Sequence, residues 1–100
     1  MPQERLEITD PDGRLVVFDA ETRAHITRRR PELLEHVDAI LGAVARPDSR
    51  REDPIPSRQH FYRRHLDGRR WLRVIVDFND EPAFIVTAFI QNTPPPGWRR

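Results

Sequence analysis

The residues best suited to chemistry lie in three short segments of this chain. The first is His25-Ile26-Thr27-Arg28-Arg29-Arg30-Pro31-Glu32, which places one histidine and three consecutive arginines at the junction of two predicted helices. The others are Phe61-Tyr62-Arg63-Arg64 and Val86-Thr87-Ala88-Phe89, both within predicted strands. A histidine can transfer protons near neutral pH, and an arginine can bind a phosphate through a planar two-point fork. A metal-independent ribonuclease requires these residue types.

Cleavage of RNA through its own 2′-hydroxyl needs a base, an acid, and cations or donors around the phosphate. His25 is the candidate base, and Tyr62 or a protonated histidine is the candidate acid. Arg29 and Arg64 are the candidate phosphate clamp, with Thr87 as a further donor. The other candidate RNA-binding residues are Arg28, Arg30, Arg63, Trp71 and Arg73. Among these, Trp71 can join Tyr62 in stacking an unpaired base.

Each candidate also has a purely structural interpretation. His25 fits an exposed position on an amphipathic helix, and Arg28-Arg29-Arg30 fits the negative end of a helix dipole. Tyr62 and Trp71 can pair with Arg73 and Arg64 across two strands as cation–π contacts. Thr87 is an ordinary β-branched strand residue. The sequence alone leaves both interpretations open.

Composition limits the classes of function. The chain has 100 residues, 37% hydrophobic and 33% charged, which predicts one small domain spanning residues 1–100. There is no cysteine, so thiol catalysis and zinc–thiolate sites are excluded, and no other metal or cofactor motif is present. All seventeen basic residues are arginine, and residues 46–100 carry eleven of them against seven acidic residues. A basic C-terminal half permits an anionic partner.

No apolar run is long enough to span a membrane, and the first residues do not resemble a secretory signal. We therefore expect no membrane partner and a cytoplasmic location, either in the producing cell or in a target cell. The sequence does not indicate an oligomeric state.

The predicted order of elements is β-β-α-α-β-β-β, an α+β fold in which two helices pack on one face of a mainly antiparallel sheet. An N-terminal hairpin occupies 5–19, and the helices occupy 20–45, with Asp19 or Thr22 as the first cap. Pro31 begins the second helix, whose apolar stripe is Leu33, Leu34, Val37, Ile40, Leu41 and Val44. An irregular connection follows to Ser57. A three-stranded sheet then occupies 58–90, and a Pro-rich, loosely held tail occupies 91–100.

Asp67-Gly68 is a strong signal for a two-residue hairpin turn. This turn pairs Arg63 with Leu72 and Phe61 with Val74, so Leu72, Val74, Val76 and Phe78 alternate as a core face. Tyr62, Arg64, Trp71 and Arg73 then lie on the opposite face. On the last strand, Phe84, Val86, Ala88 and Ile90 are predicted for the core, and Ile85, Thr87 and Phe89 for the opposite face. The turn at Asn79–Pro82 does not fix this last register.

The pattern His-Ile-x-x-Arg-x-Pro-Glu, then an aromatic-aromatic-Arg strand, then Val-Thr-Ala-aromatic, resembles the barnase/EndoU/colicin/RelE-like nuclease superfamily, in its phage- and toxin-associated branch. The resemblance covers about Thr22 to Phe89. It implies a RelE/barnase-like fold and metal-free cleavage of RNA. It assigns His25 as base or acid, Arg29 to phosphate, Tyr62 and Arg63 to the strand motif, and Thr87 to the final hydroxyl.

Two departures from the family pattern stand out. Arg30 occupies the position of the usual histidine before the proline, and the hairpin register favours Arg64 over Arg63 as the outward arginine. The leading hypothesis is a small toxin- or phage-type endoribonuclease that acts on RNA and has an antitoxin or immunity protein as its protein partner. The alternatives are an inactive module that binds nucleic acid or protein on the same fold, and a housekeeping protein.

Overall fold

The computed structural model describes residues 5–64 and 68–98. Along the chain it contains β1 (Leu6–Thr9), β2 (Leu15–Phe18), α1 (Ala20–Arg29), the 3₁₀ helix η1 (Pro31–His36), α2 (Val37–Ala45), β3 (Ser49–Glu52), β4 (Arg58–Arg64), β5 (Trp71–Asp77) and β6 (Ala83–Gln91). The predicted α+β class is confirmed at this level. Some predicted features lie outside the described residues, namely His65, the predicted turn residues 66 and 67, and the last two residues of the tail.

All six strands join one mixed sheet in the order β1-β2-β6-β5-β4-β3. The predicted three-stranded sheet is therefore only part of a larger sheet. The N-terminal hairpin joins it through a parallel β2–β6 contact at Val16↔Ala83 and Val17↔Phe84. The irregular connection predicted before Ser57 also contains β3, which pairs antiparallel with β4. The sequence Ser-Arg-Arg-Glu of β3 has no apolar alternation, so only its pairing with β4 makes it a strand.

The register of the β4–β5 hairpin is the predicted one. Arg63 lies opposite Leu72, and Phe61 lies opposite Val74. Phe61, Leu72, Val74 and Val76 are at most 2% exposed and belong to the main core. We call this side of the sheet the helix face, because α2 packs against it.

The predicted pattern of β6 is correct at one end and wrong at the other. Ala88 is buried opposite Val74, as expected. A bulge between Ile75 and Val76 then shifts the register, so Ile85 is buried in the core and Phe84 is 38% exposed. One extra residue in a strand reverses the direction of every side chain beyond it, and the alternation in the sequence does not reveal such an insertion.

Helix α1 has the predicted bounds. Its cap is Asp19, whose carboxylate accepts a hydrogen bond from the Thr22 backbone N–H at 2.7 Å. The second helix differs from the prediction, because Pro31 opens the 3₁₀ turn η1 and the α-helix starts only at Val37. The 3₁₀ turn rotates its side chains by a different angle, and Leu34, predicted for the core, is 66% exposed.

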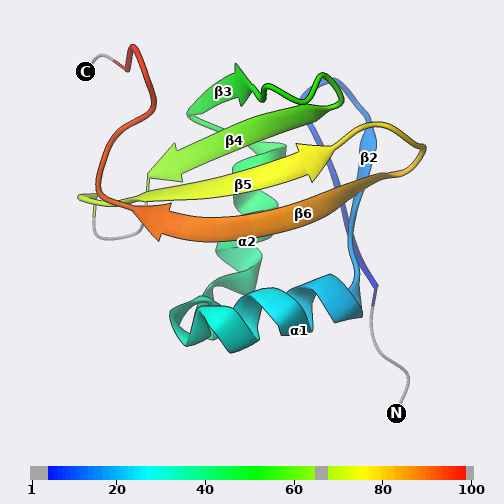
Figure 1. The fold of residues 1–100 in the computed structure, drawn as a ribbon, viewed down its shortest axis with the longest axis horizontal. Helices are drawn as coiled ribbons and strands as arrows, with labels where there is room; N and C mark the ends of the chain where they lie inside the picture. The colour runs from blue at the N-terminus through cyan, green and yellow to red at the C-terminus, as the bar shows by residue number, and fades with distance from the viewer. Residues whose placement is uncertain (1–4, 65–67, 99–100) are drawn as a thin grey trace.

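The sequence predicted that both helices pack on one face of the sheet. Ile26 of α1 is buried in the same core as Ile40 and Val44 of α2, but the two helices cover different parts of the sheet. Helix α2 passes behind β4, β5 and β6, while α1 lies along the edge of β6 (Figure 1). This edge is accessible because β2 pairs with only Ala83 and Phe84 of β6. The rest of β6 has no strand on that side among the described residues.

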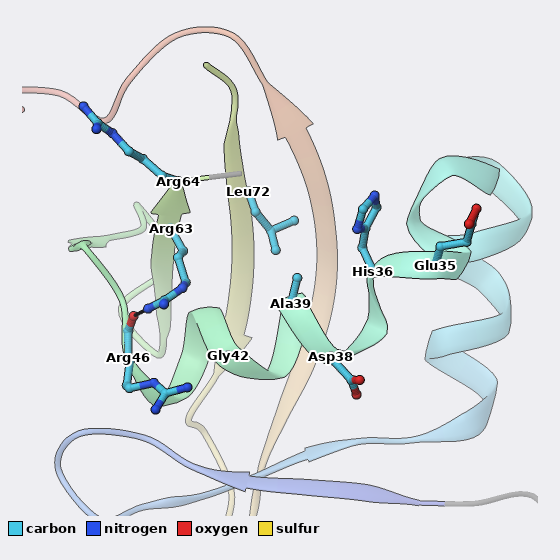
Figure 2. A pocket seen from close by; sticks show the side chains of 9 residues that line it. All are labelled: Glu35, His36, Asp38, Ala39, Gly42, Arg46, Arg63, Arg64 and Leu72. Carbon is cyan, nitrogen blue, oxygen red and sulfur yellow. Dashed lines mark hydrogen bonds between the residues drawn. The ribbon is translucent and has the colours of Figure 1, made fainter. Parts of the chain in front are cut away.

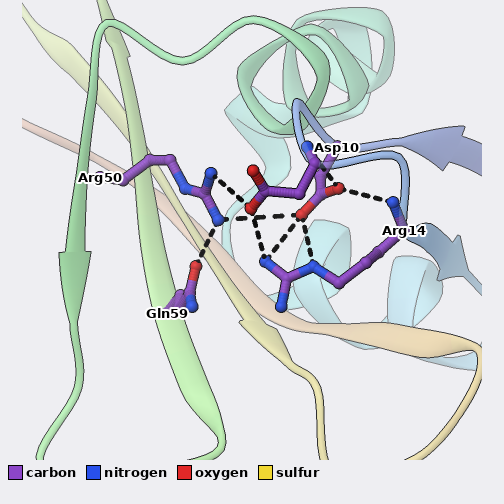
Figure 3. Close-up of polar contacts among 5 residues, drawn as sticks. Asp10, Arg14, Arg50 and Gln59 are labelled. Carbon is purple, nitrogen blue, oxygen red and sulfur yellow. Dashed lines mark hydrogen bonds and ion pairs between the residues drawn. The ribbon is translucent and has the colours of Figure 1, made fainter.

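A buried ion pair ties the hairpin tip to the far strands of the sheet (Figure 3). The side chain of Asp10 is completely buried and accepts hydrogen bonds from the backbone N–H groups of Asp12 and Arg14, at 3.0 and 2.8 Å. The Arg14 guanidinium contacts the other carboxylate oxygen at 2.8 Å. Arg50 of β3 lies 3.8 Å from the same oxygen and donates to Gln59 of β4 at 2.6 Å.

The C-terminal tail is packed on the sheet rather than loosely held. Pro95 is fully buried, and the Trp98 ring meets Trp71 edge-on with centroids 4.8 Å apart. The Arg51 guanidinium also donates to the Pro96 carbonyl. Within the described residues, no helix is both long and apolar enough to cross a membrane.

Candidate active site

The face of the sheet opposite α2, which we call the outer face, carries most of the residues proposed from the sequence. The pairings Tyr62↔Arg73, Arg64↔Trp71, Arg73↔Phe89 and Ile75↔Thr87 place these side chains on one side. The outer-face candidates are Tyr62, Arg64, Trp71, Arg73 and Thr87.

A histidine that the sequence analysis did not select organises the centre of this face. His60 is 6% exposed, its Nε2 lies 2.5 Å from an oxygen of Asp53, and its Nδ1 lies 2.8 Å from Arg73 Nε. An arginine only donates hydrogen bonds, so Nδ1 is the acceptor and Nε2 carries the proton that points at Asp53. Both ring nitrogens are therefore engaged. His60 positions Arg73 and is not a ready proton carrier.

The pKa of Asp53 lies below its ordinary value of 3.8. The largest cause is the backbone N–H of Ile55, which donates to the carboxylate at 2.8 Å, and the second is the hydrogen bond with His60. Desolvation acts in the opposite direction and is outweighed. The carboxylate that orients His60 is thus held in its charged form.

Arg73 is fixed from both sides. Its Nη1 donates to Gln91 at 3.2 Å, and its Cζ lies 5.4 Å from the Tyr62 ring and 5.2 Å from the Phe89 ring. Arg30, at the end of α1, lies over the same Phe89 ring at 5.5 Å. Two guanidinium groups therefore share one aromatic ring at the edge of the sheet. Each still has N–H groups that can bind an anion, because a guanidinium carries five.

Arg64 and Trp71 lie at the other end of the strands, with the tail. The Arg64 Cζ is 5.6 Å from the Trp71 ring and 5.9 Å from the Trp98 ring. Trp71 is only 4% exposed, so its ring is not open to a base in this arrangement. The Nε1 of Trp98 is buried without a hydrogen-bond partner among the described residues. These contacts match the cross-strand cation–π interpretation of the sequence.

Helix α1 runs beside β6 in the same direction, and two contacts fix how they align (Figure 1). Near the start of the helix, Thr22 lines one cavity with Phe84 and Val86 of β6. At the end of the helix, Arg30 reaches Phe89. The eight residues from Thr22 to Arg30 rise about 12 Å as a helix. The four residues from position 85 to Phe89 rise about 13 Å as a strand. The two lengths agree.

This alignment places His25 roughly level with Thr87 along the direction of β6. His25 is about 4.5 Å beyond Thr22 along the helix axis. Thr87 is about 7 Å beyond position 85 along the strand. His25 and Arg29 are spaced i and i+4, so they lie one turn apart on the exposed side of α1, while Ile26 is the buried residue of this helix. His25 and Arg29 are both exposed.

The structure thus gathers one subset of the predicted site and separates the rest. Thr87 lies on β6, Arg30 and Arg73 contact its Phe89 ring, and His25 and Arg29 lie on the exposed side of the neighbouring helix. We call this set the β6-edge site. Tyr62 lies beside it but is 2% exposed. Arg28 is exposed on α1, and Arg64 is held near the two tryptophans. Arg63 lies on the helix face, where it donates to the Arg46 carbonyl, as the hairpin register predicted.

Sequence reasoning missed three contributors, which are Asp53, His60 and Gln91, and it placed Phe89 on the correct face without giving it a role. The position of His60 on the outer face followed from the register, and its proximity to Arg73 was the available signal. Asp53 lies in an irregular connection before a proline, where no periodicity indicates direction. The described residues hold no group of three or more His, Asp or Glu side chains suited to a metal ion.

Comparison with protein-family models, with curated proteins and with solved structures found no match to this chain.

Proposed function

We propose that this chain is a small endoribonuclease that cleaves RNA through the ribose 2′-hydroxyl without a metal ion, and that the scissile phosphate binds at the β6-edge site. The observation that carries the proposal is the alignment of α1 with β6, which puts His25 level with Thr87 and brings Arg30 onto the ring that Arg73 also faces. On this view the fold is a variant of the RelE/barnase-like arrangement, with α1 displaced to the sheet edge.

The β6-edge site supplies most of the required groups. His25 is exposed, so it can accept the 2′-hydroxyl proton and exchange it with water. Arg29 and Arg73 bind the phosphate oxygens, and the hydroxyl of Thr87 donates a further hydrogen bond. The Asp53–His60 pair holds Arg73 in place before substrate arrives, which reduces the cost of orienting it.

The β6-edge site has no exposed side chain in the position of the general acid other than arginine. Tyr62 is buried beside Arg73, and Arg30 stands where the family resemblance leads one to expect a second histidine. General acid catalysis is typically worth about 10²- to 10⁴-fold in rate. The proposal therefore describes a slow ribonuclease, and it makes Arg30→His a gain-of-function substitution.

The test uses single-stranded RNA labelled at its 5′ end, in excess chelator. We expect slow cleavage that leaves cyclic-phosphate ends, no cleavage of His25→Ala, and about 100-fold faster cleavage by Arg30→His. Arg5→Gln removes an exposed arginine whose described contact is with Glu7, so it is the matched control and should cleave like the unaltered protein. RNA with a 2′-deoxy sugar at the cleaved position should resist. Cleavage that persists in His25→Ala, or that needs added metal, contradicts the proposal.

A second candidate function is an inactive RNA-binding module, and the engaged state of the outer face favours it. His60 has both nitrogens occupied, and Arg30 and Arg73 already lie against an aromatic ring. If Arg30→His also fails to cleave, binding is the remaining role. Three phosphate contacts, by Arg29, Arg30 and Arg73, then predict a log–log salt slope of about −2 on single strands.

The two candidates also differ in what the producing cell requires. A toxin-type ribonuclease that cleaves cellular RNA harms the cell that makes it, so an antitoxin or immunity protein belongs to the first proposal and not to the second. Growth of cells that produce the protein alone separates them. Arrest that His25→Ala relieves supports the nuclease, and unimpeded growth together with salt-sensitive RNA affinity supports the binding module.

A further inference from the structure

A second pocket lies on the helix face, on the opposite side of β4 and β5 from the β6-edge site (Figure 2). It has a volume of about 310 Å³, roughly that of ten water molecules in the liquid. This volume is at the lower end of the range for small-molecule sites. The pocket is bounded by α2 on one side and by the ends of β4 and β5 on the other.

The floor of the pocket is apolar and flat, while its wall is cationic. Leu72, Ala39 and Gly42 form the floor, and Arg63 and Arg46 come from the strand and helix ends on one side. Arg63 donates one N–H to the Arg46 carbonyl, and its guanidinium retains other N–H groups for a ligand. An apolar floor beside a guanidinium fork suits a ligand with a planar ring and an anionic group.

Gly42 keeps the floor of the pocket open. It lies in the interior of α2, where glycine is less favourable than alanine. A Cβ added there meets no described atom within 4 Å, so packing does not exclude a side chain. A larger side chain at this position would instead occupy part of the pocket.

Glu35 and Asp38 also line the pocket, but their carboxylates are directed away from its apolar floor in Figure 2. The floor and the arginines alone therefore define the ligand. Arginine forks match phosphate oxygens, and a nucleoside base supplies the planar ring for the apolar floor.

We propose that the pocket between α2 and the ends of β4 and β5 binds a nucleoside monophosphate, with the base over Gly42 and Ala39 and the phosphate on Arg63. This site is separate from the β6-edge site and does not depend on the proposed ribonuclease activity. Arg64, next to Arg63 on β4, also lines the pocket, although its guanidinium lies over the Trp71 and Trp98 rings.

The test is an NMR titration of the full chain with AMP, adenosine, inorganic phosphate and benzoate, followed through the amide signals of Gly42 and Ala39. We expect AMP to bind at least ten-fold more tightly than adenosine or phosphate. Gly42→Leu, which fills the floor, and Arg63→Gln, which removes the fork, should each weaken AMP at least ten-fold. His25→Ala and the control Arg5→Gln should bind AMP normally.

Several outcomes would overturn the inference. Equal binding of AMP and phosphate would exclude the base, and equal binding of AMP and benzoate would exclude the phosphate. No binding of AMP at millimolar concentration, or unchanged binding in a folded Gly42→Leu protein, would exclude the site. Gly42→Leu introduces a better helix former into open space, so it remains testable even if Arg63→Gln does not fold.

Discussion

Replacement of Asp10 tests how the hairpin tip is held to the rest of the sheet. The carboxylate is completely buried, and it accepts two backbone N–H groups and the guanidinium of Arg14, with Arg50 nearby (Figure 3). Asp12 contacts the same two arginines at 3.3 and 3.1 Å, but its side chain is 59% exposed. Asp10→Ala and Asp12→Ala therefore remove one carboxylate each from one cluster and differ mainly in burial.

The expected magnitudes differ several-fold. Two lost backbone hydrogen bonds cost about 1 kcal/mol each, and a hydrogen bond to a charged group costs about 1.5–3 kcal/mol. Together these give about 3–5 kcal/mol for Asp10→Ala, the range seen when one member of a buried pair is removed. An exposed ion pair is worth about 0–1 kcal/mol, which is the expectation for Asp12→Ala. Asp10→Asn keeps one acceptor oxygen and should fall between them.

Urea unfolding measures these differences. With a slope of about 1.5 kcal/mol per molar, the midpoint should fall by about 2–3 M in Asp10→Ala and by less than about 0.7 M in Asp12→Ala. Equal shifts for the two variants would mean that burial of the Asp10 carboxylate does not govern the closure of the hairpin onto β3 and β4. The reasoning from burial would then be refuted.

Three further outcomes are expected. Trp98→Ala should cost little stability, because the lost aromatic contact, about 0.5–1.5 kcal/mol, is offset by removal of a buried unpaired N–H that costs about 1–3 kcal/mol. The same change uncovers the Trp71 ring, so it should raise RNA affinity and shift Trp71 fluorescence to longer wavelength. Lower RNA affinity would contradict this. The lowered pKa of Asp53 means that the unfolded chain takes up this proton first as the pH falls below about 4, so urea midpoints should drop there, and drop less in Asp53→Asn. Leu34→Ser should change unfolding by at most about 0.5 kcal/mol, since this leucine is 66% exposed, and a larger loss would place it in the core after all.

The sequence correctly predicted the elements whose bounds are set by neighbouring residues in the chain, such as helix caps and tight turns. The bounds of α1 follow from the cap at Asp19 and the proline at position 31. The two-residue turn predicted from Asp-Gly gave the register that β4 and β5 have, which places Arg63 and Arg64 on opposite sides of the strand. The relative positions of Tyr62 and Arg73 came from the same arithmetic.

The features that sequence reasoning missed all depend on contacts between distant segments. The bulge beside Ile75 leaves the alternation of β6 intact in the sequence and reverses it in space. Strand β3 is a strand only because β4 offers it an edge. The fit of Trp98 against Trp71 joins the tail to a strand end, and Pro-rich composition alone predicts an extended chain without saying what it packs against.

The candidate site depends on one such contact, the short parallel ladder between β2 and β6. The ladder joins only two residue pairs, Val16↔Ala83 and Val17↔Phe84. A longer ladder would cover the β6 edge with backbone and would exclude α1 from it. Because the ladder stops at Phe84, the helix takes the place of a strand and brings His25 level with Thr87. The position of α1 beside β6 is thus a consequence of where strand pairing ends, which no motif in the sequence encodes.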